Sequence, residues 1–514
     1  MGTGTSADTA LHPIARPKRV PSEHGVTEVA GAKPLGPLLG ISDESLETQP
    51  HQGWIARRLA VAVVVTAVAY GAGYAAAVAE SAAGSRTPHL VALPVLIVLI
   101  ATGYRTPPRG VGDTESNWII ALMVAVPALA GIELLGNRLP TLAALWHLRD
   151  FGAIVWFAAL LAVLFGVRHV VRMWPLWIFA ASFVSPLPWI LVTAAAGGSD
   201  AAAAAPAAVA GAAAVFLACP EVPRFRRMLA ASACLVVATA FIVTAGPHLP
   251  LPATALFVGA ALPVAVTLLY RHRAARSGPT AWAAPHRISA RSVTALAAMA
   301  GVLAVSNPAT ARPAPLPTAA ADWINAAGLT SSSSYGFISR YAGPAATFVR
   351  YRPSAPSGSS APAVDVITAP DRAALAAIDD LTWYPTSQPV NYRPAPTGSG
   401  LPAGARIAHT NADAARDGRN TDWVAIAWEW QAGNVFQRVT IVADQSPTGG
   451  RRLPEPSPVS VLDVSLRPAL WVARQQPDAA GDVDDIVLRD AVALGAELNA
   501  AATGHPADGL TTDA

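Results

Sequence analysis

The sequence contains few cysteines and few charged residues, and each scarcity excludes a class of protein. Only Cys219 and Cys234 are present among 514 residues, too few for a disulfide framework or a cysteine-rich metal site. Charged residues make up 13% of the chain, whereas about a quarter of a soluble globular domain is charged. Hydrophobic residues reach 53%, and the net charge is only +3. This balance indicates a membrane protein whose main partner is the lipid bilayer, and it gives no argument for nucleic-acid binding.

The common catalytic signatures are also missing. The sequence has no Walker loop, no H-E-x-x-H, no G-x-S-x-G and no C-x-x-C motif. We therefore expect no nucleotide-driven pump, no cofactor and no bound metal. Acidic residues within the apolar runs, the usual sign of proton or cation coupling, are limited to Glu133 near the end of one run. We interpret Glu133 as an interfacial residue.

Nine apolar runs fill the part of the chain before residue 310. They lie at 60–78, 89–103, 118–135, 151–167, 173–194, 201–217, 228–245, 251–270 and 293–306. Helix is the expected conformation, because backbone N–H and C=O groups in hydrocarbon must be satisfied within the segment, and about 20 apolar residues cross the bilayer. The sequence thus predicts an α-helical polytopic membrane protein with about nine transmembrane helices.

Arginine clusters follow every second run and are nearly absent after the others. The clusters are Arg57/Arg58, Arg105/Arg109, Arg168/Arg172, Arg224/Arg226/Arg227 and Arg271/Arg273/Arg276/Arg287/Arg291, and the opposite connections carry only isolated residues such as Arg86, Arg138 and Arg149. Short loops rich in Lys and Arg resist translocation. The pattern predicts a multi-pass protein of the cell membrane with a cytoplasmic N-terminus and an exported C-terminal part.

Composition divides the chain into four parts. Residues 1–53 read as a disordered cytoplasmic tail, 54–311 as the polytopic transmembrane domain, 312–322 as a Pro/Ala linker and 323–514 as an extracytoplasmic α+β domain. An alternative arises at the last run, since Arg291, a short apolar stretch and the Ala309 to Ala311 sequence follow the order of a cleavable signal. Cleavage near Ala311 would release the C-terminal domain on the outer side.

The C-terminal domain shows strand and helix patterns. Strands are predicted at 347–352, 364–368, 423–430, 435–442, 459–464 and 469–473, and helices at 323–327, 371–378 and 483–501. The Gly433 and Asn434 pair predicts a hairpin turn. Alternation puts Trp428 and Trp430 on one face of that hairpin, where we expect them to form core.

Other aromatic residues of this domain offer a second interpretation. Trp383, Tyr384, Tyr392 and Arg393 could join the two tryptophans in a surface that binds a sugar or a peptide. His409 is interpreted as a loop residue.

Polar residues at the outer ends of the runs are the candidate site residues. The segment 139–150 mixes apolar and polar residues and predicts an interfacial or re-entrant helix. His147, Arg149 and Asp150 would then lie at the edge of an outward-facing cavity, as would His248 at the outer end of the seventh run.

A local pattern between the fourth and fifth runs resembles a known family. The residues are Gly166, Arg168, Arg172 and Pro175, followed by Pro186-Leu187-Pro188. The arrangement is similar to that of the exosortase/archaeosortase family, membrane-embedded transpeptidases that process C-terminal sorting tails, some with an appended extracytoplasmic domain.

The resemblance implies a catalytic Cys followed by Ser or Ala and Gly near the outer face. Here Cys219 is followed by Pro220 at the cytoplasmic end of its run, and Cys234 is followed by Leu235. A thiolate nucleophile cannot act across the bilayer from its partners. The resemblance therefore implies a divergent relative that lacks the peptidase reaction.

Three functional hypotheses remain. The first is this divergent relative, a cell-envelope protein whose membrane part works with an exported domain and an envelope protein or polysaccharide partner. The second is a membrane glycosyltransferase acting on a lipid-linked substrate, which needs a carboxylate in an outer loop, where only Glu80 offers itself. The third is a transporter component, which predicts internal repeats, and no clear duplication is present.

Overall fold

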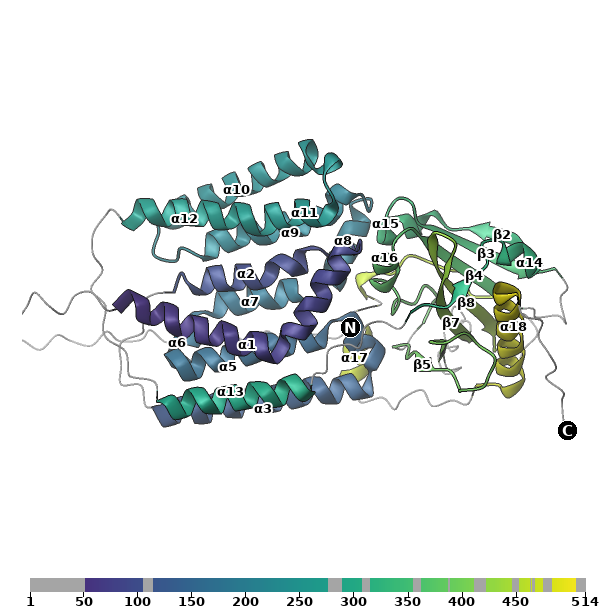
Figure 1. Ribbon diagram of the computed structural model, residues 1–514, viewed down its shortest axis with the longest axis horizontal. Helices are drawn as coiled ribbons and strands as arrows, with labels where there is room; N and C mark the ends of the chain where they lie inside the picture. The colour runs from purple at the N-terminus through teal and green to yellow at the C-terminus, as the bar shows by residue number, and fades with distance from the viewer. Residues whose placement is uncertain are drawn as a thin grey trace, which may run out of the picture. The chain divides into compact units, whose positions relative to one another are not determined.

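The computed structural model of the chain combines a bundle of helices with a mixed sheet domain (Figure 1). It describes residues 51–104, 114–275, 289–306, 315–354, 362–386, 389–410, 422–445, 453–462, 464, 467–474 and 483–504. The predicted N-terminal tail, 1–53, lies almost wholly outside these residues, as does the cleavage motif at Ala309 to Ala311.

Every one of the nine apolar runs is helical. The helices are α1 (His51–Ala82), α2 (His89–Ala101), α3 (Thr114–Arg138), α4 (Pro140–Leu145), α5 (Leu148–Phe165), α6 (Val167–Arg172), α7 (Trp174–Val184), α8 (Leu187–Ala195), α9 (Asp200–Leu217), α10 (Arg224–Thr244), η2 (Gly246–His248), α11 (Leu251–Leu256), η3 (Phe257–Ala261), α12 (Leu262–Ala275) and α13 (Ala290–Ser306). Residues 139–150 contain the short helix α4 and the start of α5, so helix is present in this segment as predicted.

Six helices are long and apolar enough to cross a membrane. They are Ile55–Ala82, Glu115–Arg138, Leu148–Phe165, Asp200–Leu217, Arg224–Thr244 and Leu251–His272. The pair α7 and α8 counts as a seventh if it is one span, bent by 65° at the Pro186-Leu187-Pro188 break. α2 and α13 have 13 and 17 residues, shorter than the roughly 20 that a straight crossing needs. The chain is thus a multi-pass membrane protein by the length and composition of its helices.

The arginine-rich ends of the helices lie together at one end of the bundle (Figure 1). Arg58, near the start of α1, donates to the carbonyl oxygen of Leu164 at the end of α5. Arg271 of α12 donates to Thr102 Oγ1 at 2.7 Å and to the Ala218 carbonyl oxygen at 2.8 Å, at the ends of α2 and α9. Guanidinium groups therefore satisfy helix C-terminal carbonyls, which otherwise lack partners.

The C-terminal region is an eight-stranded sheet with short helices. Its elements are β1 (Thr318–Ala319), α14 (Trp323–Ala326), β2 (Leu329–Ser334), η4 (Gly336–Ile338), α15 (Ser339–Ala342), β3 (Thr347–Pro353), β4 (Ala363–Ala369), α16 (Arg372–Ala376), β5 (Arg393–Pro394), β6 (Arg406–His409), β7 (Trp423–Ala432), β8 (Val435–Asp444), α17 (Arg467–Ala473) and α18 (Asp485–Thr503). The strand order is β2-β3-β4-β8-β7-β6-β5, antiparallel throughout, and β1 adds to β7 in parallel.

The two faces of this sheet bury different residues. Trp428 and Trp430 of β7 pack with α18, and both are at most 2% exposed, so the interpretation of these indoles as core is confirmed. Glu429, between them, faces the other side, because successive side chains of a strand alternate. That second face is covered by α16 and the segment after it, which contribute Leu375, Ile378 and Trp383 to the core.

Three predictions about this domain were wrong. Residues 459–464 and 469–473 were expected to be strands, but the second stretch lies in the helix α17 and the first is not extended into any sheet. Pro468 stands in the first turn of α17, where its fixed φ favours a helix start. His409 ends strand β6 opposite Val424, so it is not a loop residue.

Contacts join the sheet domain to the helix ends opposite the arginines. Leu187 and Ile190 of α8 share a hydrophobic cluster with Ile338 and Tyr341. The Trp146 indole donates to the carbonyl oxygen of Val464 at 3.0 Å. Arg86, in the connection from α1 to α2, is buried and bonds both Asp200 and the Gly198 carbonyl oxygen. This end of the bundle is called the domain-side end below.

Candidate functional site

An apolar cavity of about 330 Å³ lies within the bundle and is called the bundle cavity here. Four helices line it, with Tyr70 and Tyr74 from α1, Pro94 from α2, Phe157 from α5, and Trp177 from α7 among the wall residues. Glycine and alanine on α1, Gly71, Gly73 and Ala77, leave the space that larger side chains would fill. A cavity of this size and lining accepts an apolar chain.

Ionisable side chains collect where the bundle cavity meets the domain-side end. Asp150, in the first turn of α5, lines the cavity and accepts a 2.9 Å hydrogen bond at Oδ2 when His147 Nδ1 carries the proton. Glu80, near the end of α1, lies within electrostatic range of both residues. We call Glu80, His147 and Asp150 the rim cluster. Asp150 is the member of the rim cluster that lines the bundle cavity; His147 is bonded to Asp150, and Glu80 is exposed.

The backbone of His147 is unusual. Its φ is 52°, and among the described residues it is the one non-glycine with a positive φ. Histidine tolerates this left-handed region better than most residues, yet the conformation still costs free energy. His147 lies between α4 and α5 and is the N-cap residue of α5, and its imidazole is hydrogen-bonded to Asp150. A strained backbone position therefore holds the imidazole of the rim cluster.

Close packing of α1 on α5 fixes the remaining wall. The Tyr70 hydroxyl approaches the backbone at Gly152 so closely that a Cβ there would lie 2.9 Å from it. Tyr74 donates to the carbonyl oxygen of Val91 at 2.9 Å, which ties α1 to the start of α2. The hydroxyl groups of Tyr70 and Tyr74 are therefore polar groups in an otherwise apolar wall.

The structure brings together only some of the predicted site residues. His147 and Asp150 are hydrogen-bonded to each other, and Glu80, which is exposed, lies within electrostatic range of both. Arg149 is exposed and is not among the lining residues of the bundle cavity. His248 is exposed in η2, between α10 and α11, two helices that do not line the cavity.

The cysteines and Glu133 also lie apart from the rim cluster. Cys219 follows Ala218, whose carbonyl oxygen bonds Arg271 at the arginine-rich end. Cys234 is buried in α10. Glu133 lies on α3, where its Oε1 is 3.5 Å from the Asn137 amide. Neither thiol has a place near the imidazole of His147.

The sheet domain contains a second set of buried ionisable groups. Arg350 and Asp365 form a two-bonded ion pair with both distances 2.7 Å, and the Tyr384 hydroxyl donates to the same carboxylate at 2.8 Å. Arg406 pairs with Asp379 and Asp380. These side chains form hydrogen bonds and ion pairs with one another, and these interactions stabilise the fold.

Glu429 is the exception in that set. Burial raises the pKa of Glu429 to about 7, with a further contribution from Asp379, while Arg438, Arg372 and Arg406 act in the opposite direction. One of its carboxyl oxygens, Oε1, is buried without a hydrogen-bond partner among the described residues. Glu429 therefore changes charge near neutral pH.

The aromatic surface predicted for this domain is not a single surface. Trp428 and Trp430 lie in the core on the α18 side, and Trp383, Tyr384 and Tyr392 are buried on the other side. Only Arg393 of that set is exposed. Within the part of the chain that the structure describes, no group of three or more His, Cys, Asp or Glu residues is arranged to hold a metal ion.

Comparisons with known proteins give no further guide. No protein-family model matches the chain, and searches of characterised proteins and of solved structures find no match either.

Sequence reasoning missed the tyrosines of the cavity wall. Tyr70 and Tyr74 stand four residues apart on α1, so they lie on one helix face, next to Gly71 and Gly73. Two phenols in a helix of alanine and valine were the available signal. The sequence did not show which helix these tyrosines contact, because α5, their partner, follows about 80 residues later.

Proposed function

We propose that the chain is a membrane glycosyltransferase of the cell envelope that acts on a lipid-linked substrate. The observation that carries this proposal is the apolar bundle cavity with a carboxylate and imidazole cluster at its edge. An apolar cavity takes the lipid chain, and ionisable groups at its end meet the polar part of the same molecule. The sequence left this hypothesis open. In the proposal, the bundle cavity takes the lipid chain of the substrate and the rim cluster meets its polar part.

The chemistry follows from the three residues of the rim cluster. Glu80 accepts the proton of an acceptor hydroxyl while that oxygen forms a bond to the anomeric carbon of the donor sugar. The bond from the anomeric carbon to the lipid phosphate breaks, and its electron pair leaves with the phosphate oxygen. His147 acts as an imidazolium: its Nδ1–H bonds Asp150, which orients the ring, and its Nε2–H donates a hydrogen bond to the leaving phosphate oxygen.

The proposed topology has about nine crossings, with the N-terminus cytoplasmic and the sheet domain outside. Support comes from Arg58 and Arg271, which bond helix carbonyl oxygens at the end of the bundle away from the sheet domain. α2 and α13 then cross as short helices, which a locally thinner bilayer or burial against neighbours accommodates. In this orientation the rim cluster faces the outer side of the cell membrane.

Kinship with the exosortase/archaeosortase family remains a prediction. Its support is the bend at Pro186-Leu187-Pro188 and the appended domain. The position of Cys219 at the arginine-rich end favours a relative without the peptidase reaction. No specific observation favours a transporter.

The bundle cavity is tested by filling it. Ala153→Phe adds a ring to the cavity wall, and Val126→Phe adds the same ring on α3, where Val126 is 56% exposed and outside the cavity. Labelling of the full chain in vesicles by a photoactivatable polyprenyl phosphate should fall at least fivefold for Ala153→Phe and stay unchanged for Val126→Phe. Equal labelling of the wild-type chain and Ala153→Phe would refute a lipid site in this cavity.

The rim cluster is tested separately. Glu80→Gln and His147→Ala should keep the photolabelling, because neither fills the cavity, but should remove an envelope glycan in a deletion strain. Arg149→Ala and His248→Ala serve as controls that restore the glycan. If all four variants restore it, the catalytic role of the rim cluster is wrong.

A further inference from the structure

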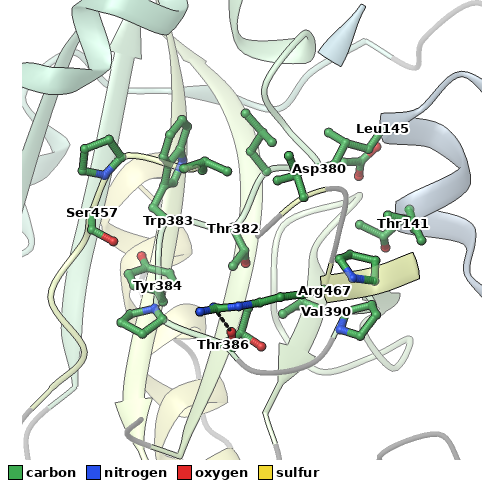
Figure 2. A pocket seen from close by; sticks show the side chains of 18 residues that line it. Thr141, Leu145, Asp380, Thr382, Trp383, Tyr384, Thr386, Val390, Ser457 and Arg467 are labelled. Carbon is green, nitrogen blue, oxygen red and sulfur yellow. Dashed lines mark hydrogen bonds between the residues drawn. The ribbon is translucent and has the colours of Figure 1, made fainter. Parts of the chain in front are cut away.

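A second cavity, of about 380 Å³, lies between α4 and the sheet domain (Figure 2). We call it the loop cavity. The Thr141 hydroxyl in its wall accepts a hydrogen bond from the Tyr392 backbone N–H at 2.9 Å, and Arg467 Nη1 donates to the Thr386 carbonyl oxygen at 3.3 Å. The loop cavity mixes hydroxyl groups with apolar side chains, whereas the wall of the bundle cavity is almost wholly apolar. A lipid chain therefore fits the bundle cavity, and the polar groups of that wall decide which lipid it takes.

The described residues that line the bundle cavity include four side-chain hydrogen-bond donors. Three of them donate to backbone carbonyl oxygens, namely Thr66 at 2.8 Å, Tyr74 at 2.9 Å and Trp177 at 2.9 Å. The fourth is Tyr70, whose hydroxyl forms no hydrogen bond with another residue that the structure describes. Because that oxygen is not enclosed by protein atoms either, it is open to the cavity. Tyr70 thus supplies the one unused donor of the described wall.

The Tyr70 hydroxyl lies beside the first turns of α5. A Cβ at Gly152 would be 2.9 Å from it, so glycine at this position makes room for the phenol. Tyr70 is also within electrostatic range of Asp150, the member of the rim cluster that lines the cavity. The unused donor therefore lies where the apolar wall meets the rim cluster.

A free phenol hydroxyl in an apolar wall favours a ligand oxygen that accepts a hydrogen bond. In the proposed reaction, the His147 imidazolium offers a second donor, Nε2–H, to the same part of the substrate. Two donors suit the oxygens of a phosphate group, because hydrogen bonds to a charged acceptor are stronger than those between neutral groups. The Tyr70 hydroxyl is thus placed to bind the phosphate that joins the lipid chain to the sugar.

The charges around the cavity limit how many phosphates the lipid carries. No Lys or Arg is among the described residues that line the bundle cavity, and the His147 imidazolium is matched by the Asp150 carboxylate at 2.9 Å. A lipid that holds its sugar through one phosphate has one negative charge there, whereas a diphosphate has two. Each negative charge that enters an apolar site without a cation is costly. The cavity therefore favours one phosphate over two.

We propose that Tyr70 determines the substrate class of this chain, a lipid carrier that holds its sugar through a single phosphate, by donating its hydroxyl to an oxygen of that phosphate. The inference rests on the proposed function for the reaction itself. The hydrogen bond and the preference for one phosphate can still be measured without a sugar and without turnover. Tyr70 binds the phosphate beside the rim cluster, and the lipid chain extends into the bundle cavity.

The test uses the full chain in nanodiscs of a zwitterionic phospholipid and three photoactivatable probes with the same polyprenyl chain. The probes are a methyl phosphate with one negative charge, a methyl diphosphate with two, and an uncharged methyl ether. The wild-type chain should reach half-saturated labelling at the lowest concentration with the methyl phosphate. Tyr70→Phe removes the hydroxyl and keeps the ring, so it should need about tenfold more of the methyl phosphate. For the methyl ether the change should be less than about threefold.

Tyr74→Phe is the matched control, because it removes a phenol hydroxyl from the same wall that already donates to the Val91 carbonyl oxygen. Any loosening of the wall in Tyr74→Phe should change the labelling by the methyl phosphate and by the methyl ether by the same factor. The inference is overturned if Tyr70→Phe binds the methyl phosphate as the wild type does, or if Tyr74→Phe loses the same preference as Tyr70→Phe. Stronger labelling of the wild-type chain by the diphosphate also overturns it.

Ala153→Phe separates this inference from the proposed function. It fills the bundle cavity, so it should reduce labelling by all three probes. If it does so while Tyr70→Phe has no effect, the lipid site stands and the role of Tyr70 is wrong. If Ala153→Phe leaves the labelling unchanged, the lipid site is wrong, and the role of Tyr70 is wrong with it.

Discussion

In the sheet domain, the buried guanidinium of Arg350 makes two hydrogen bonds to Asp365, whereas in the bundle the buried hydroxyls of Thr254 and Thr267 have no hydrogen-bond partner among the described residues. The two regions therefore differ in whether their buried polar atoms have hydrogen-bond partners. The sheet domain pairs its charges across neighbouring strands, since Arg350 and Asp365 stand opposite each other in the register of β3 and β4. The bundle buries few charges and leaves small polar groups unpaired.

The difference shows where each region places its ionisable groups. In the sheet domain they are internal and hold α16 and the following segment on the sheet, as Arg438 does by donating to the Ile378 carbonyl oxygen at 3.0 Å. In the bundle they lie at the helix ends, where Arg271 bonds carbonyls at one end and His147 and Asp150 pair at the other. Charges inside the sheet domain are paired within the fold, and the charges at the domain-side end are those to which the proposed chemistry is assigned.

The largest expected effect comes from breaking a pair in the sheet domain. Asp365→Ala leaves Arg350 buried without its carboxylate, and loss of one partner of a buried pair costs about 3–5 kcal/mol. Pulse proteolysis of the full chain in urea and detergent measures the free energy of unfolding of this domain. Asp322→Ala, at an exposed position with no capping hydrogen bond, is the control and should change it by less than about 0.5 kcal/mol. A loss below about 1 kcal/mol for Asp365→Ala would contradict the stabilising role of the pair.

A smaller effect is expected at Glu429, the one carboxyl of that network with an unpartnered oxygen. Its folded pKa, about 7, is above its ordinary value of 4.5, so its stabilising contribution is complete below about pH 4.5 and is lost as the pH rises through about 7. Glu429→Gln should therefore stabilise the domain at pH 8 by about 2–3 kcal/mol and flatten the stability profile between pH 4.5 and 7. Unfolding of both proteins across that pH range measures this slope. An unchanged slope would show that Glu429 is not the titrating group.

The smallest effect is expected in the bundle. Thr267→Val replaces a buried hydroxyl that has no partner among the described residues with a methyl group of similar shape, so it should be neutral or stabilise the bundle by up to about 1 kcal/mol. Thr66→Val removes a hydroxyl that donates to the Ala62 carbonyl oxygen at 2.8 Å, and should not stabilise. Thermal unfolding in one detergent compares the two. Destabilisation by Thr267→Val of more than about 1 kcal/mol would mean that its hydroxyl has a bound water or lipid partner.

Much of the local structure could be predicted from the sequence. Helices stand at all nine apolar runs, and the hairpin of β7 and β8 turns at Gly433 and Asn434, as the period-two pattern predicted. The amphipathic helix predicted at 483–501 is α18, Asp485–Thr503. Each of these signals is local, because the spacing of apolar residues and the turn residues are contained within about 20 positions. The serine-rich strand β2 was missed, since its residues have little preference for strands and depend on β3 for pairing.

The candidate site could be predicted only in part. The residues His147, Asp150 and Glu80 stood out as polar groups at the ends of apolar runs, but the sequence placed Arg149 and His248 on equal terms with them. The tertiary structure separates these candidates, because Glu80 lies within electrostatic range of His147 and Asp150, whereas His248 lies between α10 and α11, which do not line the bundle cavity.

The sequence alone determined the membrane character of the chain, the positions of its helices and the end of the bundle that carries its arginines, since each depends on hydrophobicity and charge counted along a short stretch. Tertiary structure alone decided which helices enclose the bundle cavity, which polar residues share its rim, and how α4 and the sheet domain enclose the loop cavity. Many of those contacts join residues far apart in the chain, such as Tyr70 with Gly152 and Trp146 with Val464, and no local pattern encodes them.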